Sequence, residues 1–274
     1  MKSKNIRAII FVLGGAATIL IGAAVGWCAM RPMTICLTFD DGLKAHATVA
    51  GPLLRKYGWF GAFAIVTEEN HSLHPVFSRY AMATAAEIKS LHAAGHSIFP
   101  HTVTHPNLKS LAESGHHQAM VEEIVKSRQA VLRITGESPP FFVLPYNALN
   151  DEVAAVIQSN QMIPVDWGRT DFGYHGTKYQ TEEFVSDYLE AIYKGGAWHE
   201  DIMIHGIRIS EGGWRAFEDD HDFEQFLLAI KSLEAAGKIR VVPFAAAHST
   251  GTFGRAVIRM LAFVRRQIYK RLIY

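Results

Sequence analysis

Two short polar motifs in the sequence carry side chains that could bind a metal ion and move protons. Asp40 and Asp41 follow the apolar run Thr34–Phe39, and His101 and His105 follow a second apolar segment further along the chain. Two histidines four residues apart can converge on one ion, and an aspartate with two histidines forms a three-ligand set that leaves a position for water. A second aspartate beside such a set can act as a base. The combination suits metal-assisted hydrolysis of an acyl bond.

The segments around these motifs alternate between expected strands and expected helices. Alternating β and α elements imply a parallel sheet covered by helices. Polar motifs at the ends of about seven βα units fit an α/β fold of the (β/α) barrel type, with its chemistry at the carboxyl rim of the strands. An open doubly wound sheet is the alternative, which the lack of a GxGxxG motif after the first strand disfavours. The expected strands are Thr34–Phe39, Gly61–Val66, Ser97–Phe99, Phe141–Leu144, Met162–Val165, Asp201–Ile204 and Arg240–Val242, and the expected helices are Thr48–Tyr57, Thr84–Ala94, His117–Ile134, Asp151–Ser159, Thr181–Tyr193 and Asp222–Ala236.

Each polar motif comes directly after one of the expected strands. Pro145 and Tyr146 follow the fourth strand, and His205 ends the run Ile202–His205. Taken alone, an Asp-Asp-Gly sequence is typical of a turn, and a single histidine after an apolar strand is commonly a buried structural residue. Because a barrel brings the ends of its strands to one rim, the motifs together favour a functional site.

In this order, Thr38–Gly42, His101–His105, Pro145 with Tyr146, and Ile202–His205 resemble the motifs of the polysaccharide deacetylase family. This family is also called carbohydrate esterase family 4 and is defined by the NodB-homology domain. The likeness covers about residues 33–245 and includes the stretch Glu87–Leu108. It implies a distorted (β/α) barrel and one divalent ion, usually zinc, with cobalt, nickel, manganese or iron as other options.

The resemblance also assigns roles to single residues. Asp40 would be the general base on water at the ion, and His205 the acid that protonates the leaving amine. The backbone N–H of Tyr146, beside Pro145, would help to hold the oxyanion, and such a preorganised donor contributes about 3 kcal/mol. The implied metal ligands are Asp41, His101 and His105.

The chain departs from the family pattern near the third motif. The family usually has an arginine two residues before the motif-three proline, where it orients the base. Here that position is Val143, and Asn147 replaces the usual glycine. Some deacetylases that act on poly-N-acetylglucosamine also lack this arginine, and the chain resembles that branch locally.

A fourth motif in the family normally gives an aspartate that tunes the catalytic histidine and a tryptophan that lines the substrate groove. The stretches Val165–Trp167 and Asp171-Phe172 compete for this place. We assign Asp171 and Phe172 to the motif and Trp167 to the groove wall. Plain core packing is the alternative for Trp167 and Phe172, because aromatic burial requires no ligand.

The remaining histidines and the two cysteines show no second convergent pattern. Cys28 lies in the apolar leader and Cys36 in the first strand, so no disulfide framework is expected. We interpret the other histidines as surface or helix residues: His46, His71, His74, His92, His96, His116, His117, His175, His199, His221 and His248.

The N-terminal 30 residues read as a membrane anchor or a signal segment. Ala8–Met30 is uncharged and mainly apolar, which is long enough to span a bilayer. Lys2, Lys4 and Arg7 should stay in the cytoplasm, so a single-pass cell-membrane protein would place its body on the periplasmic or extracellular side. Secretion after cleavage of a signal peptide is the alternative, although signal peptides usually have a shorter apolar region.

Charge separates the body from the ends of the chain. Residues 31–250, the predicted catalytic barrel, carry 18 basic and 26 acidic residues, a net charge of −8. This charge argues against a nucleic-acid partner, because phosphate binding needs cations. Residues 251–274 contain six basic residues and no acid, and within 255–274 an apolar stripe predicts an amphipathic helix. Such a helix would lie on the membrane surface or, alternatively, pack on the barrel.

The sequence therefore predicts a metal-dependent N-acetylglucosamine deacetylase acting on a cell-envelope or extracellular glycan. A glycoside hydrolase is one alternative, but its carboxylates stand about 5 Å or more apart across the sugar, which adjacent Asp40 and Asp41 serve poorly. A catalytically weak glycan-binding relative is the other, and Val143 and Asn147 suggest it.

Overall fold

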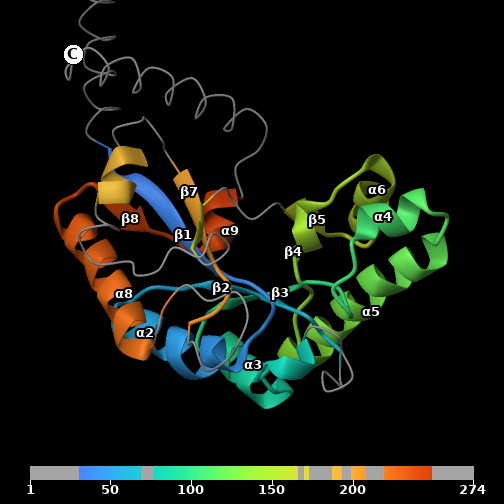
Figure 1. Ribbon diagram of the computed structural model, residues 1–274, viewed down its shortest axis with the longest axis horizontal. Helices are drawn as coiled ribbons and strands as arrows, with labels where there is room; N and C mark the ends of the chain where they lie inside the picture. The colour runs from blue at the N-terminus through green and yellow to red at the C-terminus, as the bar shows by residue number, and fades with distance from the viewer. Residues whose placement is uncertain are drawn as a thin grey trace, which may run out of the picture.

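The structure is a computed structural model that describes residues 31–68, 77–165, 170–172, 187–192, 199–207, 217 and 219–248. Within these ranges parallel strands alternate with helices, which gives the predicted α/β class (Figure 1). The predicted anchor at 8–30 and the predicted helix at 255–274 lie outside the described residues. Among the described helices, none is both long enough and apolar enough to cross a membrane.

The main sheet is built around strand β1 (Met33–Phe39). Along one edge, β1 pairs in parallel with β7 (His199–Ile204), from Thr34 opposite His199 to Phe39 opposite Ile204. Two strands share its other edge, since β8 (Ile239–Val241) pairs with the start of β1 and β2 (Ala62–Ile65) with its end. Beyond these, β3 (Ser97–Pro100) pairs with β2, and β6 (Thr170–Phe172) pairs with β7. The carboxyl ends of β1, β2, β3 and β7 therefore lie along one edge of the sheet.

A second, smaller sheet contains β4 (Phe141–Val143) and β5 (Ile163–Val165), also in parallel. It lies with α4 (Leu108–Glu113), α5 (His117–Thr135) and α6 (Asp151–Ser159) to one side of the main sheet (Figure 1). In the described part of the chain, hydrogen-bonded pairing joins neither β3 to β4 nor β5 to β6. The described strands thus form two parallel sheets rather than one continuous ring.

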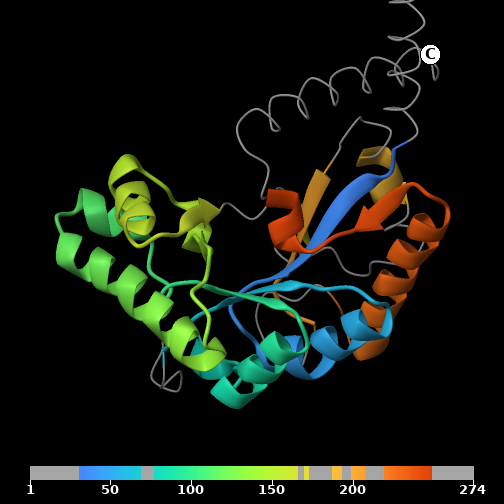
Figure 2. The same cartoon turned by 180° about the vertical axis from the view of Figure 1, so that it is seen from behind.

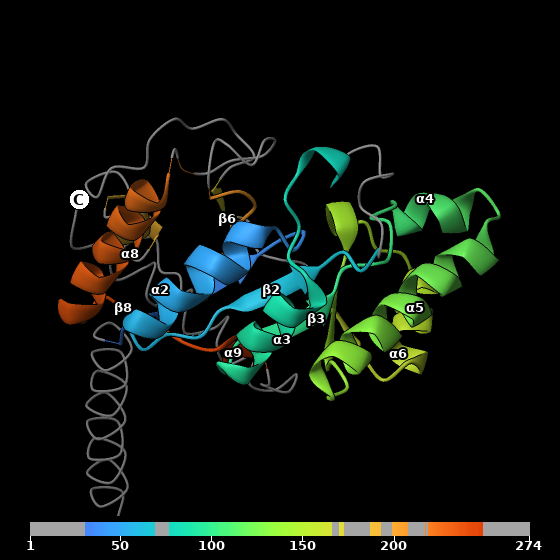
Figure 3. The same ribbon diagram turned by 90° about the horizontal axis from the view of Figure 1, so that it is seen from below.

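Helices cover the outer side of the main sheet. α2 (Gly51–Lys56) and α3 (Ala85–Ala93) lie below β2 and β3 in Figure 1, and the view from below in Figure 3 shows α8 (Asp220–Ala235) beside β8. The alternation of side chains along β1 explains how both faces are filled. Ile35, Leu37 and Phe39 join the core under these helices. Cys36 points the other way, into a cluster with Phe99 and Phe141.

Local signals in the sequence set several helix ends. Helix α3 begins at a capping box, in which Glu87 N donates to Thr84 Oγ1 at 3.2 Å and Thr84 N donates to Glu87 Oε2 at 2.8 Å. It ends before Gly95, as predicted, where φ is 93°. A Cβ at Gly95 would lie 2.6 Å from the Phe60 ring, so both the conformation and the space require glycine.

Several elements differ from those expected. The helix predicted at Thr48–Tyr57 begins two residues earlier, as a π-helical turn over His46–Ala50, and continues as α2 to Lys56. Strand β6 and helix α4 were not predicted, nor was α9 (Phe244–His248), which contacts β1 and lies beside it in Figure 2. Strand β7 begins at His199, two residues before the predicted start, and the helix predicted at Thr181–Tyr193 is described, and helical, only over 187–192.

Candidate active site

The carboxyl end of β1 carries the two aspartates. Asp40 N donates to Ile204 O at 3.0 Å, which extends the pairing with β7 by one residue and fixes the position of Asp40 at the rim. Asp41 then has a φ of 76°, in the left-handed region that residues with a Cβ adopt at a conformational cost. The change of direction at Asp41 turns the two side chains to different positions, as the strand-end location predicts.

The carboxyl end of β3 carries the two histidines of the HxxxH motif. His101 N donates to Ile65 O at 3.0 Å, which continues the pairing of β3 with β2. The chain then closes a tight loop in which Thr102 and His105 both have positive φ, 65° and 57°, and His105 N donates to Thr102 Oγ1 at 2.9 Å. This loop brings the rings of His101 and His105 to a centroid separation of 4.8 Å.

Glu123 of helix α5 holds the same loop from outside. One carboxylate oxygen accepts from Val103 N at 2.7 Å and from Thr104 N at 2.9 Å, and the other accepts from Thr104 Oγ1 at 2.6 Å. A carboxylate that accepts three donors restrains the backbone between the two histidines. The sequence analysis did not single out Glu123, because a glutamate on an amphipathic helix matches the ordinary pattern of a solvent-facing residue.

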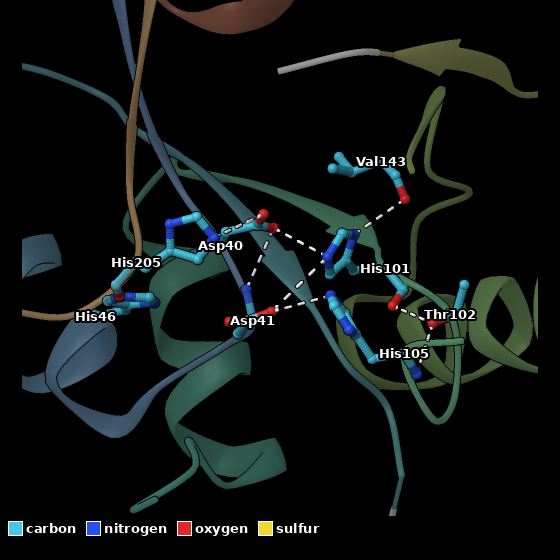
Figure 4. A network of polar contacts seen from close by, with 8 residues as sticks. All are labelled: Asp40, Asp41, His46, His101, Thr102, His105, Val143 and His205. Atoms are coloured by element: carbon cyan, nitrogen blue, oxygen red, sulfur yellow. Dashed lines mark hydrogen bonds and ion pairs between the residues drawn. The ribbon is translucent and has the colours of Figure 1, made fainter. Parts of the chain in front are cut away.

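Asp41, His101 and His105 form a compact set of donor atoms (Figure 4). The three donor atoms lie within 4.8 Å of one another, with His105 Nε2 3.4 Å and His101 Nε2 3.8 Å from Asp41 Oδ1. Asp41 Oδ1 and His101 Nε2 are buried, and among the described residues neither has a hydrogen-bond partner. Buried polar atoms without partners are uncommon, and two that face the same small space fit a divalent cation.

The protonation states also suit a cation. Burial lowers the pKa of His101 to about 4, so this ring is neutral near pH 7. Its Nδ1 lies 3.1 Å from the carbonyl oxygen of Val143, which can only accept, so Nδ1 carries the hydrogen and Nε2 keeps its lone pair. Burial and the adjacent charge of Asp40 raise the pKa of the Asp41 carboxyl. A positive ion at this place would reverse that shift by favouring the carboxylate.

Asp40 lies between the donor set and His205. Its Oδ1 is 3.2 Å from His101 Nε2 and its Oδ2 is 3.6 Å from His205 Nε2 (Figure 4). Asp41 N also faces Asp40 Oδ1 at 3.3 Å. Asp40 and His205 are therefore placed together at the rim but come from neighbouring strands, β1 and β7.

A buried histidine, His46, contacts the backbone of His205. His46, in the π-helical turn, faces the backbone oxygen of His205 with its Nε2, and burial lowers the pKa of the His46 ring to about 3. Nε2 must donate in this contact, because the partner is a carbonyl. The prediction that the remaining histidines are surface or helix residues holds for His46 only as a helix residue, since its side chain is buried. It is wrong for His96, which is buried outside a helix and whose Nδ1 accepts from Gly61 N at 3.1 Å, and for His199, which lies in strand β7.

The third motif lies beside the donor set. Tyr146 follows β4 with a φ of 59°, is 66% exposed, and packs its ring edge-on against His105 with centroids 4.8 Å apart. Its neighbour Pro145 is buried. Val143 contributes its backbone oxygen to His101, while its side chain is fully buried.

The fourth motif is described only in part. Asp171 and Phe172 lie in β6, opposite Met203 and Ile204 of β7, so their backbone adjoins the strand that leads to His205. The structure describes no side chain at these two positions. Trp167, predicted to line the groove, lies outside the described residues, as does the competing Asp166.

Comparisons with known proteins identify the family of the chain. Residues 29–165 match the polysaccharide deacetylase family. Chitin deacetylase 2 of Cryptococcus neoformans is 23% identical over 164 residues, which are 59% of this chain but only 32% of that protein, so the chain spans about a third of its curated relative.

Two solved structures show the same fold at low identity. The Bc1960 peptidoglycan N-acetylglucosamine deacetylase superimposes with a TM-score of 0.58 at 17% identity, over 81% of this chain and 91% of that one. A carbohydrate esterase family 4 pseudoenzyme from Bacillus anthracis gives a TM-score of 0.56 at 16% identity, over 79% of this chain and 65% of that one. With half of its length matched, in the part that carries Asp40, Asp41, His101 and His105, the chain belongs to the polysaccharide deacetylase family.

Proposed function

We propose that the protein is a metal-dependent deacetylase that removes N-acetyl groups from N-acetylglucosamine units of a cell-envelope or extracellular glycan. The observation that carries this proposal is the donor set Asp41, His101 and His105, with Asp40 and His205 directly beside it. A carboxylate and a histidine next to an open three-ligand set supply the base and the acid that amide hydrolysis needs. Zinc is the first choice of ion for two nitrogens and one carboxylate oxygen.

Each residue of the site has a distinct part in the reaction. When bound, the ion would polarise the acetyl carbonyl and lower the pKa of a water molecule. Asp40 takes a proton from the attacking water molecule while the water oxygen forms a bond to the carbonyl carbon. His205 gives a proton to the amine nitrogen as the carbon–nitrogen bond breaks, so that acetate and a free amine are released. The N–H of Tyr146, next to the donor set, stabilises the oxyanion.

We also infer that the two parallel sheets belong to one distorted (β/α) barrel of about seven βα units. The contact from His101, after β3, to Val143 of β4 supports this, because it joins the two sheets at the rim where the site lies. The likeness in fold to solved deacetylases supports it as well.

A catalytically weak glycan-binding relative is the second candidate. Two observations favour it: the likeness in fold to a family pseudoenzyme, and the presence of Val143 and Asn147 where the family pattern has other residues. A glycoside hydrolase is disfavoured, because Asp40 and Asp41 are adjacent and both face histidines rather than opposite sides of a groove.

Acetate release from a panel of glycans, measured with defined metals, tests the proposal. The chain is stripped of metal, reloaded with zinc or cobalt, and given chitin oligomers, poly-N-acetylglucosamine or peptidoglycan fragments. We expect Asp40→Asn and His205→Ala to keep the ion but lose roughly 10²–10⁴-fold in rate. His101→Ala should lose both the ion and the activity, whereas His92→Ala, on the outer helix α3, should keep both.

Three results would count against it. A wild-type chain that binds the ion but releases no acetate from any of these glycans supports the weak relative instead. Cleavage of glycosidic bonds without acetate release supports a glycoside hydrolase. Full metal retention in His101→Ala would show that the proposed ligand set is wrong.

A further inference from the structure

A second cluster of side chains that could bind a metal comes from β1 and β7, four residues before Asp40 and His205. The parallel register puts Cys36 directly opposite Asp201 and Thr34 directly opposite His199. Cys36 and Asp40 are four residues apart on one strand, so they share a face at a separation of roughly 13 Å along it. Asp201 and His205 have the same relation on β7. The two clusters therefore lie one after the other along the same face of these strands.

The second cluster is as compact as the first. Donor atoms of Cys36, His199 and Asp201 all lie within 4.8 Å of one another, the same limit that the Asp41, His101 and His105 set meets. His199 Nε2 is 2.9 Å from Asp201 Oδ1. Cys36 is fully buried, Asp201 is nearly so, and His199 is half-buried. One thiol, one imidazole and one carboxylate are thus held together with little solvent between them.

A fourth donor comes from the far end of the described chain. His248, the last residue of α9, places its Nε2 3.1 Å from Asp201 Oδ1 and 3.0 Å from Oδ2. Its ring stacks on Phe244 with centroids 4.0 Å apart and meets the His199 ring edge-on at 5.3 Å. These ring contacts hold the imidazole so that Nε2 points at the Asp201 carboxylate.

The surroundings orient the donors as they do in metal sites. Thr34 Oγ1 lies 2.9 Å from His199 Nδ1, so a hydrogen bond holds the nitrogen that faces away from the cluster and leaves Nε2 directed into it. Metal-bound histidines typically have their second nitrogen fixed in this way. Cys36 Sγ donates to Val242 O at 3.3 Å, just before α9, so the thiol and His248 meet at the same corner of the fold.

We propose that Cys36, His199, Asp201 and His248 form a second metal site that binds a zinc-class divalent cation independently of the active site. Sulfur and nitrogen donors together select zinc over calcium or magnesium. Four protein donors would leave no open position for water, so the site is structural rather than catalytic. The ion would connect β1 and β7 with α9, three elements far apart in the sequence. This proposal does not depend on the deacetylase activity.

Binding must release one proton. Only the thiolate is a ligand, and in the metal-free cluster Cys36 Sγ donates to Val242 O, so it is the thiol form that is present. The cation takes the sulfur lone pair as the S–H proton leaves to the buffer.

Cobalt titration of the full chain tests the site. A thiolate bound to Co²⁺ gives a near-ultraviolet charge-transfer band that nitrogen and oxygen ligands do not give. We expect two ions per wild-type chain and this band. Cys36→Ser should lose the band and one ion, whereas Cys28→Ser, at the other cysteine of the chain, should keep both. His101→Ala, which removes an active-site ligand, should keep the band and lose the other ion.

A second variant guards against misfolding. If Cys36→Ser does not fold, His248→Ala is used instead, because His248 is half-buried at the end of a helix. It should lower the affinity of the site that gives the band for cobalt by at least about tenfold, the smallest loss typical when a group that supports a metal site is removed. Wild-type protein that binds one ion with no thiolate band overturns the proposal and makes the cluster a hydrogen-bonded network around Asp201. A band that persists in Cys36→Ser or disappears in Cys28→Ser overturns it as well.

Discussion

Val143 affects the candidate active site through its backbone, although the family pattern has an arginine side chain at this position. Its carbonyl oxygen fixes His101 Nδ1, while its side chain is fully buried in the cluster with Phe99 and Phe141. The environment of the side chain is therefore apolar. A charged group at this position would have to leave water for an apolar cluster, which costs free energy.

We predict that Val143→Arg gives no gain in deacetylation and destabilises the protein. An uncompensated buried charge costs about 3–5 kcal/mol, and each kcal/mol lowers the melting temperature by about 2–4 °C in a domain of this size. Thermal unfolding should therefore shift by roughly 6 °C or more, whereas Val143→Leu, an apolar change, should shift it by much less. A large rate increase in Val143→Arg with unchanged melting would show that the site accepts the family's arginine, and would refute this prediction.

The sequence was enough to find the residues at the carboxyl ends of the strands, because each is an aspartate or a histidine that directly follows an apolar run. Asp40, Asp41, His101, His105 and His205 meet as the strand-end argument predicts, although their roles remain predictions. It could not identify residues whose partners are distant and unpatterned. His46 contacts the backbone of His205, 159 positions away, and Thr34 contacts His199, 165 positions away. Only the pairing of β1 with β7 brings such residues together.

At the scale of elements, helix α5 links the outer shell of the protein to the histidine loop. Its 19 residues show the helical spacing that predicted it, with Met120, Ile124 and Val131 buried. The same helix presents Glu123 to the backbone of Val103 and Thr104. The conformation of the loop between two metal-binding residues therefore depends on one side chain of a neighbouring helix.

We predict that Glu123→Ala weakens metal binding at the active site without unfolding the protein. Loss of groups that hold metal ligands typically reduces affinity by about 10–100-fold, and Glu123 holds the loop that sets the His101–His105 spacing. Competition with a chelator measures the affinity. Glu122→Ala is the matched control, because Glu122 is the adjacent exposed residue whose partners are Gln118 and Lys126 on the same helix. Equal affinities in the two variants would show that Glu123 does not set the ligand geometry.

Three short elements were not predicted from the sequence. Helices α4 and α9 have six and five residues, which are too few for a helical repeat to be recognised. Strand β6, Thr170–Phe172, has only one apolar residue and so gives no apolar run. The start of β7 was missed for another reason. His199 and Glu200 are polar and precede the apolar run Ile202–Ile204, which marked the strand, yet both residues pair with β1.

At the scale of the whole molecule, the central position of β1 organises the protein. Both edges of β1 are occupied, and β2 and β8 share one of them, which no local pattern in the sequence could predict. The candidate active site lies at the carboxyl end of β1, and the β1 residue of the proposed second metal site, Cys36, lies at the middle of the strand. Through β1 and β7, the two sites are parts of one sheet. Occupation of the second site would therefore stabilise the strands that carry Asp40 and His205.

The relation of this body to a membrane remains a prediction from the sequence. Residues 8–30 are uncharged and apolar after Lys2, Lys4 and Arg7, and residues 255–274 combine an apolar stripe with basic residues. We expect the full chain to sediment with membranes and to be released by detergent, but not by high salt, because an apolar span does not depend on charge. The catalytic body should then be accessible from the periplasmic or extracellular side.

A chain lacking residues 1–30 separates the two membrane-binding segments. If 255–274 lies on the membrane, this chain should bind anionic vesicles and not neutral ones, and it should dissociate as salt rises, because each basic residue near an anionic surface contributes about 1 kcal/mol. Arg259→Glu with Arg266→Glu should abolish binding while leaving thermal unfolding unchanged. Unchanged vesicle binding in that double variant, or a loss of folding when 251–274 is removed, would assign the segment to the protein body instead. Release of the full chain into the soluble fraction without detergent would equally contradict the anchor and favour cleavage of the leader.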